Sequence, residues 1–141
     1  MLDHRSATGL TIEDVYAAHE RILPYIHRTP VLTSSYLNEL TGAELFFKCE
    51  NFQKAGAFKV RGASNAVFGL SDEAAAQGVC THSSGNHALS LSYAAGRRGI
   101  PCNVVMPRTA PEAKKAAVRG YGGTITECEP STSSREEVFA R

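Results

Sequence analysis

The sequence predicts an α/β protein built around a parallel sheet. Between residues 78 and 128, short apolar strands alternate with helices of about ten residues, a pattern typical of consecutive βαβ units. The composition supports a packed domain, since 43% of the residues are hydrophobic and 21% are charged. The predicted strands are Gly78–Thr81, Cys102–Met106 and Gly123–Cys128, and the helices between them are Asn86–Arg97 and Pro111–Arg119, with Pro111 in the first helical position.

The N-terminal half is less regular. Thr11, with Asp14 three residues on, predicts a helix N-cap. The apolar residues that follow recur with a helical period until Pro24 kinks or ends the helix; they are Ile12, Val15, Ala18, Ile22 and Ile26. Residues 27–30 are expected to be extended, because Thr29 precedes a proline. The remaining predicted elements are a helix capped by Ser34 or Ser35 and stopped by Gly42, a strand over Glu44–Cys49, a helix over Phe58–Leu70 and a helix starting at Ser134, which is either short or cut off by the end of the sequence.

The balance of charge excludes several classes of protein. With 15 basic and 14 acidic residues the net charge is +1, which gives no argument for binding nucleic acid or an anionic membrane surface. No apolar run approaches the roughly 18 residues of a membrane span, and no apolar segment of a signal peptide follows Met1–Arg5. The sequence therefore predicts a cytoplasmic protein with no nucleic-acid or membrane partner.

The four cysteines are predicted to be reduced and mostly buried, because the sequence shows no secretory leader and no two of them form a Cys-x-x-Cys pair. Cys49 is interpreted as a core residue rather than a nucleophile. His82 and His87 are five residues apart with no cysteine at zinc-finger spacing, so no metal site is predicted. The glycines of Gly120–Gly123 follow a helix, so they are interpreted as a C-cap and strand lead-in rather than a dinucleotide-binding loop.

Lys59 is the first candidate for chemistry. It stands at the start of a predicted helix, where the positive end of the helix dipole disfavours a protonated amine. Lys54 and Arg61 add positive charge nearby, and such surroundings favour a lysine that forms a Schiff base with a carbonyl compound. The alternative from these residues alone is an ordinary solvated surface lysine.

The second candidate is the segment Thr81–His87, which follows a strand and opens a helix. Free backbone N–H groups and the helix dipole converge there and form a site for an anion, either a carboxylate or a phosphate. The hydroxyls of Ser83 and Ser84 and the amide of Asn86 add donors. The alternative is a serine-rich N-cap in which Asn86 satisfies backbone groups.

Taken together, these segments resemble the serine racemase and serine/threonine dehydratase family of pyridoxal-phosphate (PLP) enzymes. Two stretches carry the resemblance: HRTPVLTSSYLNELTGAELFFKCENFQKAGAFKVRGA and HSSGNHALSLSYAA. By resemblance, Lys59 matches the lysine that holds PLP as a Schiff base, Phe58 the aromatic residue beside the cofactor ring, and Asn86 the side chain that bonds its phenolic oxygen. Ser83, Ser84, Gly85, Asn86 and His87 match the loop that grips the substrate carboxylate.

Ser84 is the match that distinguishes racemases from dehydratases within this family. The resemblance implies that a serine here is the acid/base group of the racemases on the cofactor face opposite Lys59, where dehydratases usually carry alanine. The sequence departs from the racemase pattern at Ala88-Leu89, where that pattern has Gly-Gln, and Leu89 argues against regulation by a nucleotide.

The resemblance also implies the architecture: an α/β fold of parallel three-layer (αβα) sheets of the fold-type-II, tryptophan synthase β-like kind, in truncated form. Residues 1–72 would begin the large PLP domain and residues 73–141 would form most of the small one. The family's glycine-rich phosphate loop and divalent-cation carboxylates are not found in the sequence, so the resemblance assigns a divalent cation, as a second cofactor, to the missing C-terminal part. The complete protein is expected to be a homodimer.

The function implied is PLP-dependent β-elimination of L-serine or L-threonine to a 2-oxo acid and ammonia, with racemisation of serine as a second outcome. Lys59 would take the α-proton, and Ser84 would return a proton from the other face. The alternative is that the chain is a non-catalytic, truncated fragment of such an enzyme, inactive by itself.

Overall fold

The computed structural model describes residues 9–140, apart from the side chains of residues 132, 133 and 135. Met1–Arg5, on which the expectation about a signal peptide depends, lie outside the described residues. The helices are α1 (Ile12–Ile22), α2 (Ser35–Thr41), α3 (Lys59–Phe68), α4 (Asp72–Ala76), α5 (Asn86–Arg98), α6 (Glu112–Gly120) and α7 (Thr132–Phe139). The strands are β1 (Val31–Leu32), β2 (Phe47–Lys48), β3 (Val79–Thr81), β4 (Cys102–Pro107) and β5 (Thr124–Cys128). Three single turns of 3₁₀ helix are η1 (Leu23–Tyr25), η2 (Glu50–Phe52) and η3 (Lys54–Gly56).

The predicted parallel sheet is confirmed. Its order is β3-β4-β5, both pairings are parallel, and Val104 of β4 lies opposite Thr81 of β3 and Ile125 of β5. Alternate residues of β4 face opposite sides of the sheet. Val104 and Met106 pack with α5 in the core, whereas Val105 points to the other side and is also buried, while α7 contacts β4 and β5.

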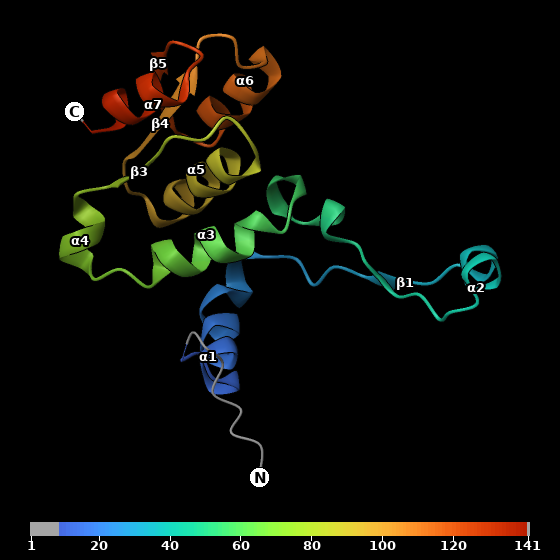
Figure 1. Cartoon of the computed structure of the whole chain (residues 1–141). Coiled ribbons are helices and arrows are strands. Elements are labelled where there is room, and N and C mark those ends of the chain that lie inside the picture. The colour runs from blue at the N-terminus through green and yellow to red at the C-terminus, as the bar shows by residue number, and fades with distance from the viewer. Residues whose placement is uncertain (1–8, 141) are drawn as a thin grey trace.

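The core lies where α5 packs against α3 on one side and against β4 on the other (Figure 1). The buried residues of α5 include Ala88, Ala94 and Ala95, which are fully buried. Because these side chains are small, the neighbouring elements can pack closely against the helix. On α3, Ala63 and Val67 belong to the same cluster. The consequence for function is that Lys59 and the segment Thr81–His87 lie at the starts of two helices that are packed side by side.

The division of the chain into two domains at residue 72 stays a prediction.

Several elements differ from expectation. The strand predicted over Glu44–Cys49 is limited to β2, which pairs antiparallel with β1, and neither β1 nor α4 was predicted. Elements of two to five residues carry no measurable hydrophobic period. Pro111 is the N-cap of α6 rather than its first residue, and α7 begins two residues before Ser134 because Ser131 is its N-cap.

Two cysteine predictions were wrong. Cys102 and Cys128 are buried as expected, but Cys80 is exposed and Cys49 is only half buried, with its Sγ 3.3 Å from the carbonyl oxygen of Phe47. Cys80 is exposed because it lies in the short edge strand β3 and, by the alternation along a strand, on the face opposite to its core-facing neighbours.

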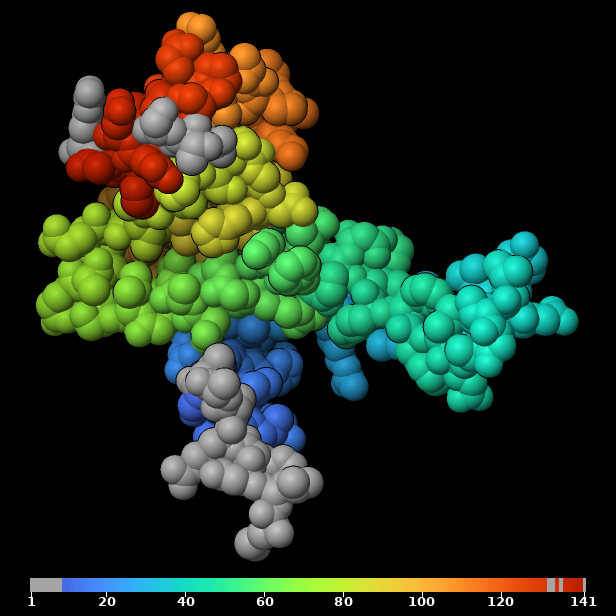
Figure 2. All heavy atoms as spheres, viewed as in Figure 1, coloured from blue at the N-terminus to red at the C-terminus, as the bar shows by residue number. Residues whose placement is uncertain are grey.

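The N-terminal segments lie outside this core. Figure 2 shows the β1–α2–β2 segment reaching away from the body of the molecule, and α1 projects in another direction. The capping box between Thr11 and Asp14 is confirmed, yet within the predicted apolar stripe Ile12 and Val15 are more than half exposed and Ile22 is buried. Exposed large apolar side chains continue along the β1–α2–β2 segment, including Leu32, Tyr36, Leu40 and Phe46.

Candidate active site

Lys59 is the first residue of α3, as the sequence predicted within one position. The chain reaches it through a tight turn in which Ala55 and Gly56 both have positive φ, 56° and 67°, after which Ala57 is extended. The Nζ atom of Lys59 lies 5.3 Å from the centre of the Phe58 ring. No hydrogen bond or ion pair links this Nζ to another residue of the described range, so the amine is available to a ligand.

The start of α5 is an open helix terminus. Gly85 is its N-cap, and among the described residues no side chain caps the helix. Ser83 instead accepts a hydrogen bond from the backbone N–H of Gly85 at 3.3 Å, which shapes the turn before the helix. The interpretation as a serine-rich N-cap was therefore wrong. The N–H groups of the first turn keep their capacity to bind an anion.

The two starting points lie close together. The turn η3, which leads into α3, contacts α5, and both helices begin on the side of the molecule from which the β1–α2–β2 segment extends (Figure 1). Burial lowers the pKa of His87, and the positive charge of Lys59 lowers it further. Both effects favour a neutral imidazole beside Lys59. Ser83, Ser84, Gly85 and Asn86 immediately precede His87 in the chain, so the fold places the predicted carboxylate-binding loop next to the predicted Schiff-base lysine.

These residues fit the chemistry of PLP. A primary amine without a partner can bond to its aldehyde, the half-exposed ring of Phe58 offers an apolar surface, and Asn86 carries a side-chain amide at the open helix start. A glycine-rich loop for the phosphate is not found in the sequence. No group of three or more His, Cys, Asp or Glu residues that could hold a metal is present in the part of the chain that the structure describes.

Arg61 has a different role from the one predicted. Instead of adding free positive charge near Lys59, its guanidinium is paired with Glu50, through Nε at 2.8 Å and Nη2 at 2.7 Å. Glu50 was missed in the sequence because no local pattern relates it to Arg61. The signal that could have found it is the cluster of polar residues, Glu50, Asn51, Gln53 and Lys54, directly before the lysine segment.

A lysine at a helix start lies beside an open helix terminus in an α/β fold with a parallel sheet, and the family of the chain accounts for this arrangement. The chain belongs to the family of pyridoxal-phosphate-dependent enzymes, since a model of that family matches residues 22–141. The predicted resemblance and fold class are confirmed by this match and by the solved structures that the chain resembles.

The individual relatives are racemases and dehydratases. Over 131 residues the chain is 78% identical to a β-hydroxyaspartate dehydratase of Paracoccus denitrificans, covering 93% of this chain and 42% of the relative. It is 54% identical over 127 residues to a serine racemase of Dictyostelium discoideum, covering 90% of this chain and 39% of the relative. The structure of maize serine racemase superposes with a TM-score of 0.90 at 53% identity, covering 92% of this chain and 40% of that one.

The chain therefore spans about two fifths of the length of the curated relatives it matches. No helix within residues 9–140 combines the length and the apolar character that crossing a membrane requires.

Proposed function

We propose that the full-length protein is a PLP-dependent enzyme that eliminates water from 2-amino-3-hydroxy acids, releasing a 2-oxo acid and ammonia. The observation that carries the proposal is the unpaired amine of Lys59 beside the open start of α5. PLP, when bound, supplies a sink for the electrons of the broken Cα–H bond. Serine racemisation is a second outcome at the same carbon atom.

Each residue then has a definite task. Lys59 holds the cofactor and afterwards takes the α-proton of the substrate. The donors of Ser83, Gly85, Asn86 and His87 bind the substrate carboxylate and so orient the Cα–H bond. Asn86 also bonds the cofactor, the ring of Phe58 lies beside it, and Ser84 moves a proton on the face opposite Lys59.

The relatives support one substrate over the others. The resemblance of the sequence motifs points to L-serine or L-threonine, whereas 78% identity to a β-hydroxyaspartate dehydratase favours β-hydroxyaspartate. All three substrates lose a β-hydroxyl group, and they differ in the group attached to the β-carbon. A second carboxylate that is bound by charge-assisted hydrogen bonds adds about 1.5–3 kcal/mol of binding, a factor of about 10–100.

We therefore expect kcat/KM for β-hydroxyaspartate to exceed that for L-serine and L-threonine by about 10–100-fold. The measurement follows oxaloacetate, pyruvate and 2-oxobutanoate separately, with ammonia as a common product. Phosphate-free buffer and added PLP keep the cofactor site loaded. Equal or higher kcat/KM with L-serine would assign the protein to serine instead, and release of ammonia from none of the three would refute the proposed elimination.

The full-length protein is also proposed to be a cytoplasmic homodimer in which residues 1–72 begin the large domain and residues 73–141 form most of the small one. Size-exclusion chromatography with light scattering tests the dimer. Limited proteolysis tests the boundary, since a linker near residue 72 would be cut before the helices on either side.

Residues 1–141 by themselves are expected to be inactive and poorly folded. Large apolar side chains of α1 and of the β1–α2–β2 segment are exposed, and each forfeits about 1.5–3 kcal/mol of burial, against a net stability of about 5–15 kcal/mol for a typical domain. The test is to express residues 1–141, add PLP, and record thermal unfolding together with ammonia release from L-serine and β-hydroxyaspartate. A sharp unfolding transition with substrate-dependent ammonia release would contradict this expectation.

A further inference from the structure

The first turn of α3 is held by a carboxylate that lies outside the helix. Arg61, two residues after Lys59, donates two hydrogen bonds to Glu50, from Nε to Oε2 at 2.8 Å and from Nη2 to Oε1 at 2.7 Å. Two parallel bonds between a guanidinium and a carboxylate restrict orientation as well as distance. Arg61 therefore cannot rotate or shift without breaking both bonds.

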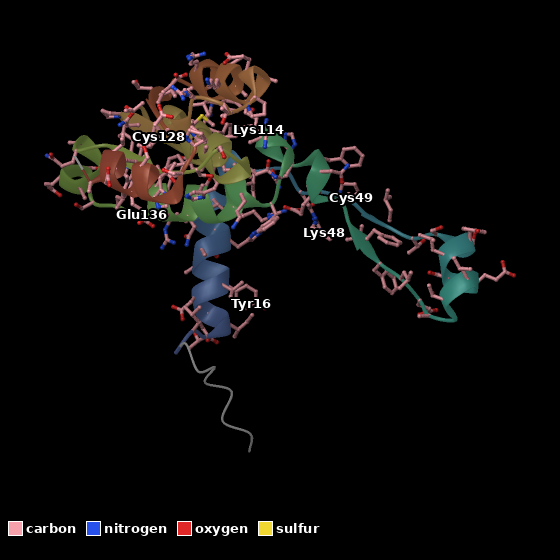
Figure 3. The ribbon with its side chains drawn as sticks, turned by 45° about the horizontal axis from the view of Figure 1, so that its top comes forward. Tyr16, Lys48, Cys49, Lys114, Cys128 and Glu136 are labelled. Carbon is pink, nitrogen blue, oxygen red and sulfur yellow. The ribbon has the colours of Figure 1, made fainter. Side chains whose placement is uncertain are left out.

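Glu50 is itself anchored to a third segment. Its Oε1 accepts a hydrogen bond from Oγ1 of Thr29 at 2.5 Å, and Thr29 is 4% exposed. The Nζ atom of Lys48 donates to the carbonyl oxygen of Thr29 at 2.7 Å. Lys48 lies where the β1–α2–β2 segment joins the body of the molecule (Figure 3). The Glu50 carboxylate thus links three segments: the connector formed by residues 27–30, the turn η2 and the helix α3.

A second set of bonds fixes the backbone between Glu50 and Lys59. The buried amide of Gln53 donates from Nε2 to the carbonyl oxygen of His27 at 2.8 Å, and its Oε1 accepts from the N–H of His27 at 2.8 Å. The same Oε1 accepts from the N–H of Lys54 at 2.9 Å. These bonds hold the connector against the segment that leads into α3.

The Glu50 carboxylate is charged at the pH of any enzyme assay. Hydrogen bonding from Arg61, followed by that from Thr29, lowers its pKa to about 2 despite partial burial. The side chains of Glu50 and Arg61 are 18% and 28% exposed, so solvent screens their attraction only in part. Arg61 is paired at every pH at which an enzyme assay is run.

We propose that Glu50 is a positioning residue for Lys59, acting by holding Arg61 and with it the first turn of α3. The helix does not fix this turn by itself, since Phe58 provides no side-chain cap and the preceding turn contains residues with positive φ. A displacement of about 1 Å in a reacting group can cost about 10²-fold in rate. The inference rests on the proposed function, because it concerns how Lys59 is presented to PLP.

The test is the rate at which Lys59 captures PLP, which is measured without any substrate. In the full-length protein, Glu50→Gln keeps the size of the side chain and removes its charge. We expect the rate constant for the appearance of lysine-bound PLP, followed by its visible absorbance, to fall about 10²-fold. Reduction with borohydride and mass spectrometry of the peptide containing Lys59 identify the site of attachment. In steady state, kcat should fall by more than KM changes.

Asp72→Asn is the matched control. It removes an ion pair of 3.0 Å between Arg98 and Asp72, beyond the opposite end of α3, and should leave the capture rate unchanged. Thr29→Val removes one hydrogen bond to Glu50 and leaves the charge of Glu50 in place, so the capture rate should fall by less than in Glu50→Gln. Thr29→Val serves as the test if Glu50→Gln does not fold.

The outcomes separate the two proposals. Wild-type capture rates in Glu50→Gln and Thr29→Val would overturn the positioning role and leave the proposed function intact. Equal losses in Glu50→Gln and Asp72→Asn, in proportion to lowered melting temperatures, would reduce Glu50 to a structural residue and also overturn it. Attachment of PLP in the unchanged protein to a residue other than Lys59 would refute the assignment of Lys59 itself.

Discussion

Lys59→Ala is expected to abolish the visible absorbance of lysine-bound PLP and all turnover in the full-length protein. Alanine has no amine to bond the cofactor and no group at this position to take the α-proton. Arg61 cannot replace the amine, because it is engaged by Glu50 and a guanidinium stays protonated. The measurements are the absorbance spectrum after addition of PLP and the release of ammonia from β-hydroxyaspartate, L-serine and L-threonine.

Two controls make the result specific. Lys54→Ala removes a lysine from the preceding turn η3 and should retain the absorbance of lysine-bound PLP. Unfolding of Lys59→Ala by heat should match that of the unchanged protein without PLP, since a loss of activity through unfolding would mimic the expected result. A Lys59→Ala protein that retained both absorbance and turnover would show that another residue holds PLP.

Ser84→Ala is expected to suppress the formation of D-serine far more than the formation of pyruvate. Racemisation requires a proton donor on the face opposite Lys59, whereas elimination requires removal of the α-proton and departure of the β-hydroxyl. A positioned acid or base contributes about 10²–10⁴-fold, so D-serine formation should fall by about that factor. Chiral chromatography of the amino acid and an enzymatic assay of pyruvate measure the two products in one reaction.

Ser83→Ala is the matched control for Ser84, because it removes a hydroxyl from the same turn. Its Oγ accepts from the N–H of Gly85, so this variant should impair both reactions together through the shape of the loop. Equal losses of D-serine and pyruvate in Ser84→Ala would make Ser84 a residue of the same kind. An unchanged protein that forms no D-serine would be a dehydratase without racemase activity.

The sequence alone determined the elements whose causes lie within a few residues. Thr11 with Asp14, Ser34 and Gly42 act on backbone groups three or four positions away, and the structure confirms all three as helix ends. The alternation that predicts β3, α5, β4, α6 and β5 also arises locally, from side chains repeating with the period of each element. The resemblance that identified the PLP family rests on contiguous stretches of the chain in the same way.

Only the tertiary structure decided which distant groups meet. In the sequence, Arg61 is expected to add positive charge beside Lys59. Folding brings Glu50 to Arg61, and the two side chains form an ion pair. The apolar residues of α1 predict a buried face, yet Ile12 and Val15 are more than half exposed, while Ile22 is buried. Burial and ion pairing depend on the segments that a side chain contacts in space, whereas local periodicity reports only the face on which it lies.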